Sequence, residues 1–194
     1  MSETVTMPGV RVVNGRPVPE PGTWEIDRAH QSFEFVARHL MAKVRGKFSG
    51  VSGAATVAEV PGESTLEIEL DATTVDTGDA TRDGHLRSND FFGTQDHPTI
   101  SFTSTGIRPG DGQTNWTVDG DLTIKGVTRP VTVDLEFLGG AIDPWGNQRI
   151  GFSGVVPEVN REDWGLTWNA ALETGGFLLS KSVRLEIEAE LVRK

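Results

Sequence analysis

The sequence predicts an all-β protein, a single antiparallel eight-stranded barrel with one short inserted helix. Three observations predict this class. Apolar and polar residues alternate with a period of two, as where Leu66, Ile68 and Leu70 are separated by Glu67 and Glu69. Turn-forming Gly, Pro, Asp and Asn separate most of the alternating runs. Several runs are long, and closure into a barrel removes the exposed edges that long strands would otherwise present.

Eight alternating runs are predicted as strands. A strand of fifteen residues would extend about 50 Å at roughly 3.3 Å per residue, so the barrel is expected to be tall. Each strand presents one apolar face and one solvated face. In chain order, the predicted strands cover 23–39, 44–60, 64–75, 98–107, 113–125, 127–138, 147–159 and 177–192.

One segment interrupts the alternation. Residues 79–92 contain few β-branched side chains, which indicates a helix inserted between the third and fourth strands. A second short helical turn is predicted at 161–165. No internal repeat or low-complexity tract is present, so the sequence indicates one domain over 23–194.

The segment 1–22 is predicted to be an irregular N-terminal arm, because it contains four prolines. It lacks the basic, then apolar, then small-residue pattern of a secretory signal, so we expect a cytoplasmic protein. The chain has no cysteine, which excludes disulfides and thiolate metal sites.

The charge balance limits the partners. Eighteen basic and 28 acidic residues give a formal net charge of −10, which disfavours binding to nucleic acids. No apolar run approaches about 20 residues, so stable membrane insertion is not expected. Homodimerisation is compatible with the sequence.

The alternation alone leaves open whether the barrel interior is filled or hollow. Barrels of about eight strands are near the size at which side chains fill the interior or one ligand occupies it. Small residues at predicted inward positions favour a hollow interior, because a filled core needs larger side chains. These residues are Ala37, Gly46, Gly50, Ala54 and Gly120.

Four motifs occur in a characteristic order, and together they give the sequence a resemblance to the YceI-like family from about Trp24 to the C-terminus. They are WEID at 24–27 with HQSFEF at 30–35, RDGHLRSNDFF at 82–92 with HPTISF at 97–102, DGDLTIKGVTRPV at 119–131, and REDWG at 161–165. The resemblance implies a lipocalin-like barrel that binds polyisoprenoid chains, including the tails of quinone-type lipids. It also implies that many relatives are exported, from which the missing signal departs. The family's usual His-Ser is here interrupted by Gln31.

We therefore expect a non-enzymatic protein without a cofactor that holds a long-chain isoprenoid lipid, such as a polyprenol, a prenyl phosphate or a quinone tail, in its lumen. The inserted helix would be either a movable lid or a static plug at one end. The predicted lumen residues are Phe33, Phe35, Phe48, Leu86, Phe91, Phe92, Phe102, Val118, Leu122 and Ile124.

A basic stretch is a candidate head-group site. No acidic residue lies between Glu34 and Glu59, whereas five basic or titratable residues do. Such a cluster could form a cationic mouth for a phosphate or another polar group, or it could be an ordinary basic hairpin. Arg82, Arg87 and Arg161 could assist it. The candidates are Arg38, His39, Lys43, Arg45 and Lys47.

Metal binding and catalysis are not predicted. His30 and His39 are separated by nine positions, an odd number, and so would point to opposite faces of a regular strand. No nucleophile elbow, phosphate-binding loop or dinucleotide fingerprint is present. Two alternatives remain, namely a barrel enzyme acting on an apolar substrate in the lumen, and an interaction module with a filled core.

Overall fold

The computed structural model describes residues 7–173 and 175–194. Twelve strands are formed by these residues, together with one α-helix, α1 (Ala80–Arg87). The strands are β1 (Val10–Val13), β2 (Arg16–Pro19), β3 (Gly22–His39), β4 (Ala42–Phe48), β5 (Val51–Val57), β6 (Thr65–Asp71), β7 (Val75–Asp76), β8 (Thr99–Pro109), β9 (Asn115–Ile124), β10 (Val127–Ile142), β11 (Gln148–Asn160) and β12 (Leu179–Arg193). Three 3₁₀ turns are η1 (Pro61–Glu63), η2 (Ala72–Thr74) and η3 (Arg161–Trp164).

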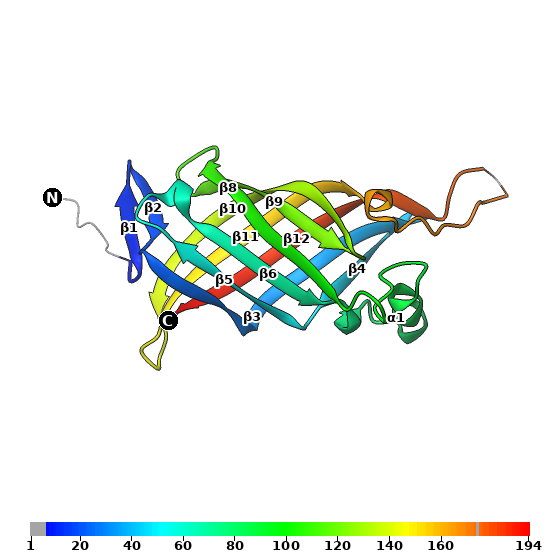
Figure 1. Ribbon diagram of the computed structural model, residues 1–194, viewed down its shortest axis with the longest axis horizontal. Coiled ribbons are helices and arrows are strands. Elements are labelled where there is room, and N and C mark those ends of the chain that lie inside the picture. The colour runs from blue at the N-terminus through cyan, green and yellow to red at the C-terminus, as the bar shows by residue number, and fades with distance from the viewer. Residues whose placement is uncertain (1–6, 174) are drawn as a thin grey trace.

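The strands form a closed antiparallel barrel, which confirms the predicted class. The ring runs β3-β5-β6-β8-β9-β10-β11-β12 and closes because β12 pairs with the long strand β3. Figure 1 shows an elongated barrel with β1 and β2 at one end and α1 at the other. Among the described residues, no helix is long and apolar enough to cross a bilayer.

Two of the eight predicted strands are each broken into two. The run predicted over 44–60 forms β4 and β5, which pair with different halves of β3. The chain bends between them at Gly50, where an added Cβ would lie 2.7 Å from the Cβ of Asp71. The run predicted over 64–75 likewise divides into β6 and β7, with η2 between them. Counting each broken pair as one position gives the eight positions that the alternation predicts.

A bulge in β3 keeps apolar residues inside along the whole strand. Ile26 pairs with Leu191, yet the next partner pair toward the C-terminus of β3 is Gln31 with Ala189. Five residues of β3 therefore span two residues of β12, and the three extra residues shift the face that points inward. As a result, the even-numbered Ile26 and the odd-numbered Phe33 are both buried in the same core.

The N-terminal arm differs from the prediction. Residues 1–6 of the segment predicted over 1–22 lie outside the described residues, but the following part is not irregular. It forms the antiparallel hairpin β1–β2, and Val18 in β2 is only 2% exposed. The sequence does contain a signal for it, since Asn14 and Gly15, both at positive φ (50° and 78°), form the two-residue turn between Val13 and Arg16. The prediction weighed the four prolines of the segment and not this turn.

The two helical predictions hold, with one change in length. Asp79 caps the N-terminus of α1, where its carboxylate accepts a hydrogen bond from the backbone NH of Arg82 at 2.9 Å. The helix ends at Arg87, so Phe91 and Phe92 follow it rather than belonging to it. The short turn predicted at 161–165 is η3, which ends at Gly165 in the left-handed conformation with φ 75°.

Candidate functional site: an apolar cavity along the barrel

The barrel encloses an elongated cavity of about 280 Å³. Side chains from all eight strand positions line it, and nearly all of them are aliphatic or aromatic. A volume of this size is near the lower end of the range for small-molecule sites, about 300–1,000 Å³. The interior of the barrel is therefore not completely filled by its own side chains.

Every residue predicted to face the lumen lines this cavity. The prediction came from alternation on the strands and from the apolar residues at and after the inserted helix. Whether these side chains contact a ligand stays a prediction. The residues are Phe33, Phe35, Phe48, Leu86, Phe91, Phe92, Phe102, Val118, Leu122 and Ile124.

Of the small residues predicted to face inward, Ala37 lines the cavity, but two of the glycines do not leave empty space. An added Cβ at Gly46 would lie 2.2 Å from the ring of Phe35, its cross-strand partner. The same holds for Gly120, where a Cβ would lie 2.3 Å from the ring of Phe102. The rings occupy the space that these glycines leave, so the glycines fix ring positions rather than hollow out the lumen. Ala54 faces the outer wall, where its partners are glutamates.

The hairpin β1–β2 closes one end of the cavity. Val18 and Pro19 line the cavity there, next to Trp116. The hairpin is held by Arg16, which donates hydrogen bonds to the carbonyls of Gly110 (2.9 Å) and Asn115 (3.1 Å) and lies over the Trp116 ring. Sequence analysis missed these lining residues, because their contacts join parts of the chain that are far apart.

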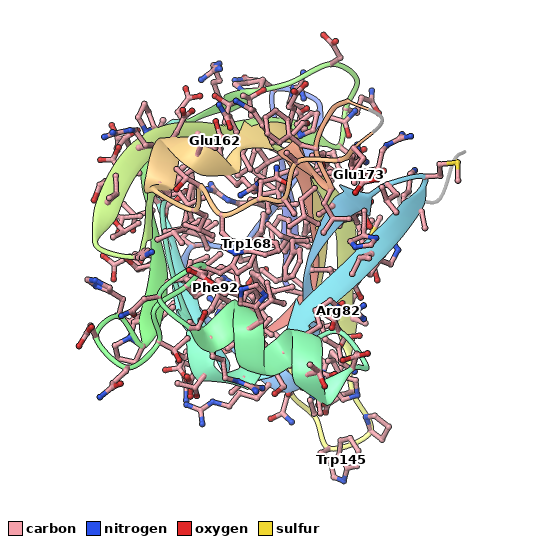
Figure 2. All side chains as sticks on the ribbon, turned by 90° about the vertical axis from the view of Figure 1, so that its right-hand side faces the viewer. Arg82, Phe92, Trp145, Glu162, Trp168 and Glu173 are labelled. Atoms are coloured by element: carbon pink, nitrogen blue, oxygen red, sulfur yellow. The ribbon has the colours of Figure 1, made fainter. Side chains whose placement is uncertain are left out.

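The other end of the cavity lies between α1, η3 and the β3–β4 hairpin. Figure 2 looks into this end and shows Phe92 and Trp168 between α1 and η3. Phe92 packs edge-on against Phe48, with ring centroids 5.6 Å apart, and Trp168 lies 5.5 Å from Phe91. Trp168 belongs to a segment for which the sequence made no prediction.

The helix α1 is attached mainly on one side. Buried Asp83 accepts hydrogen bonds from the backbone NH (2.9 Å) and hydroxyl (2.6 Å) of Thr77, and Arg87 donates to the carbonyls of Thr73 and Val75 at 2.7 Å each. Toward the β9–β10 hairpin, Lys125 donates to the carbonyl of Asn89. These contacts fix the base of the helix beside η2 and β7.

The cations of the basic hairpin lie outside the cavity lining, and their role at a head group stays a prediction. On β4, Val44, Gly46 and Phe48 face the interior, so the cations between them face outward. The predicted site residues thus lie on the outer wall or at the end of the hairpin, and the alternation within β4 itself could have revealed this. Lys43, Arg45 and Lys47 are exposed on β4, Arg38 is exposed opposite Lys43, and His39 lies partly buried at the end of β3.

Two of these cations already have carboxylate partners. Arg45 contacts Glu34 at 3.1 Å and Glu186 at 2.5 Å, and Lys47 lies 3.8 Å from Asp76. The hydrogen bond from Arg45 holds the pKa of Glu186 below its usual value. An exposed guanidinium that is shared by two carboxylates is poorly suited to binding a head group inside the barrel.

One cation does face the cavity. Arg161 begins η3, is only 7% exposed and lines the cavity. Its Nε donates to the carbonyl of Ser180 at 2.9 Å, and its Nη1 donates to the carbonyl of Leu166. Its Nη2 is buried and has no hydrogen-bond partner among the described residues. Burial lowers the pKa of this guanidinium below its usual value.

A cluster of charged groups on the bulge of β3 resembles a metal site only in part. Ligand atoms of Asp27, His30 and Glu190 lie within 4.8 Å of one another. Arg149 lies among them, 2.5 Å from Asp27 and 3.0 Å from Glu190, and it also contacts Asp143 at 2.8 Å. The guanidinium thus supplies the positive charge that a metal would bring.

Comparison with known proteins identifies the family of this barrel. The family model of the YceI-like domain matches residues 24–191. The chain belongs to this family. A UPF0312 protein of Staphylococcus aureus is 38% identical over 167 residues, which cover 84% of this chain and 94% of the relative. A UPF0312 protein of Staphylococcus epidermidis is 37% identical over 174 residues, with 86% and 95% covered.

Solved structures share this YceI-like fold. The YceI protein of Campylobacter jejuni matches with a TM-score of 0.68 and 28% identity, over 81% of this chain and 90% of that one. Burkholderia cenocepacia BcnA matches with a TM-score of 0.74 at 20% identity, over 85% and 98%. A polyisoprenoid binding domain from Saccharophagus degradans matches with a TM-score of 0.64 at 15% identity, over 90% and 100%. The matched family region begins after β1 and β2, so the hairpin that closes one end lies outside it.

Proposed function

We propose that this YceI-like barrel binds a long-chain isoprenoid lipid in its cavity and carries or presents it without altering it. The observation that carries the proposal is the cavity itself, which runs along the barrel and is lined almost entirely by apolar side chains. The polyisoprenoid binding named for the Saccharophagus degradans domain supports the same ligand class.

The energetics of transfer are consistent with a carrier. An isoprene unit of five carbons gains roughly 4 kcal/mol on leaving water, at about 0.8 kcal/mol per buried CH₂. About five units would then reach the practical limit of non-covalent affinity, near 20 kcal/mol. Such a lipid is not free in water, so the barrel competes with a membrane rather than with solvent. The net preference is small, and the lipid remains exchangeable.

A carrier rather than an enzyme is proposed because the cavity offers few groups for chemistry. An enzyme needs convergent titratable groups with shifted pKa values at the substrate. Among the described residues, the cavity lining has a single basic residue, Arg161, and its acidic members Glu34 and Glu186 contact Arg45 on the outer wall. A cytoplasmic location and a homodimer stay predictions, which cell fractionation and size-exclusion chromatography with light scattering check.

The proposal is tested by native mass spectrometry of the purified protein, followed by solvent extraction and identification of the lipid. We expect a retained species with five-carbon repeats, or uptake of an added prenol. A protein that keeps its unliganded mass after incubation with prenols, prenyl phosphates and quinones would refute the proposal. Recovery of a chemically altered prenyl lipid would favour the enzyme instead.

Two matched variants locate the ligand. Ile187 on β12 lines the cavity and is partly buried, whereas the next residue, Glu188, is exposed on the outer wall. Ile187→Trp should fill part of the lumen and reduce the bound prenol, while Glu188→Trp should leave binding unchanged. Equal effects of the two substitutions would place the ligand outside the barrel.

A further inference from the structure

Arg161 is a buried cation whose charge has no carboxylate partner among the described residues. Its two hydrogen bonds go to the backbone carbonyls of Ser180 and Leu166, and these acceptors are neutral. The neighbouring Glu162 acts on this charge only through space, since its carboxylate pairs with the ammonium of Lys181 at 2.8 Å instead of the guanidinium. Buried charges in proteins are normally paired, so the site lacks an anion.

The local sequence turns Arg161 inward. Asn160 ends β11 and caps η3, where its side-chain carbonyl accepts a hydrogen bond from the backbone NH of Glu162 at 3.1 Å. Three residues after Arg161, Trp164 is also buried and donates from its Nε1 to the carbonyl of Leu122 at 3.0 Å. The turn thus points Arg161 and Trp164 toward the cavity.

The unpartnered atom belongs to a residue of the cavity wall. Nη2 carries two N–H groups, is buried, and belongs to a residue that lines the cavity. The turn η3 lies at the end of the barrel that carries α1, where Phe92 and Trp168 occupy the opening (Figure 2). A ligand whose polar group reached Arg161 would extend its apolar chain toward the end closed by the N-terminal hairpin.

We propose that Arg161 binds an oxyanion head group, a phosphate or a carboxylate, of the long apolar ligand in the barrel. A planar guanidinium donates hydrogen bonds in a geometry that matches the oxygens of such groups. These charge-assisted hydrogen bonds stabilise a complex most in a water-poor site. A neutral hydroxyl would accept the same hydrogen bond but would leave the buried charge uncompensated. The cavity would therefore select among lipids of equal chain length by the charge of the head group. This inference rests on the proposed lipid-binding function.

The test compares two prenyl ligands of twenty carbons, a prenol and its monophosphate, with fluorescence or native mass spectrometry as the readout. The wild-type protein should bind the phosphate about ten- to hundredfold more tightly than the prenol. In Arg161→Met this preference should fall to about onefold, with prenol affinity changed less than about threefold. A fatty acid of similar length is measured in the same way, to distinguish a carboxylate from a phosphate as the bound oxyanion. The head group that Arg161 binds should be the one whose ligand loses more affinity in Arg161→Met.

Arg45→Met is the matched control, since it removes the same charge from the outer wall and should retain the preference for the phosphate. Wild-type protein that binds prenol as tightly as prenyl phosphate would overturn the inference without any variant, even if Arg161→Met does not fold. Loss of the preference in Arg45→Met, or its survival in Arg161→Met, would overturn it as well. If neither prenyl ligand binds, both the proposed function and the role of Arg161 fail. Equal binding of the two ligands refutes only the role of Arg161.

Discussion

The two ends of the barrel differ in how their charges are compensated. At the end that carries the N-terminal hairpin, Arg149 and Arg193 contact carboxylates, and Arg193 also lies over the ring of Trp24. At the end that carries α1, Arg161 is buried without a carboxylate partner among the described residues, and aromatic rings fill the opening. A satisfied charge network stabilises a closed end, whereas an unsatisfied cation beside a cavity is a feature expected of a binding site.

The largest effect is expected from Trp24, which is fully buried under the N-terminal hairpin and donates from its Nε1 to the carbonyl of Glu20. Trp24→Ala should lower the free energy of unfolding by about 3–5 kcal/mol, because it leaves a cavity. Trp145→Ala is the control, since that side chain is 81% exposed and its loss should change stability by no more than about 0.5 kcal/mol. Urea unfolding checks both, and equal losses would contradict the assignment of the closed end as core.

A smaller, pH-dependent effect is expected from Asp27 at the same end. Hydrogen bonds from Arg149 and His30 hold the pKa of the Asp27 carboxyl well below its usual range. Asp27→Asn should therefore cost about 1.5–3 kcal/mol of stability at pH 7, where the unfolded carboxyl is also ionised.

The sign of the pH dependence follows from the lowered pKa. The stabilisation is complete above the unfolded pKa of about 4 and is lost as pH falls toward the folded pKa. The stability difference between the wild type and Asp27→Asn should thus shrink progressively below about pH 4. A difference that stayed constant from pH 7 to pH 3 in urea titrations would rule out this ion cluster as its source.

The smallest effect is expected at the open end, where it distinguishes a movable α1 from a static one. Lys125→Met removes the hydrogen bond to Asn89 from the β9–β10 hairpin and leaves Asp83 and Arg87 in place. An exposed contact of this kind is worth about 0–1 kcal/mol, so stability should barely change. If α1 opens as a lid, release of a bound fluorescent lipid should accelerate up to about fivefold. An unchanged release rate would indicate that the helix is a static plug.

The class of fold and the inward faces were predictable because both depend on a local pattern. Alternation identified eight strand positions, and the ten predicted lumen residues all line the cavity. The pattern could equally have placed Lys43, Arg45 and Lys47 outside, since Phe48 and Val44 alternate with them. Their clustering in sequence suggested a binding site, although neighbouring cations on one strand can all face solvent.

Other features depended on contacts between distant parts of the chain. The bulge of β3 could not be predicted from the sequence of the strand, because it is defined only by the pairing of Ile26 and Gln31 with β12. Glycines at inward positions suggested empty space, but rings from neighbouring strands occupy it. The hairpin β1–β2 becomes ordered through Arg16 and Val18, whose partners lie about a hundred residues away or in the barrel core.

The sequence by itself determined that this chain is an antiparallel barrel with an apolar interior, because a period of two assigns each side chain to a face independently of distant partners. Tertiary structure alone decided which end is closed, how much of the interior stays empty, and which buried cation has no carboxylate partner among the described residues. These properties are sums over side chains from many strands. The sequence named Arg161 beside Arg82 and Arg87 as a possible helper at the head group, and only the packing of η3 against β12 and the cavity distinguishes it from them.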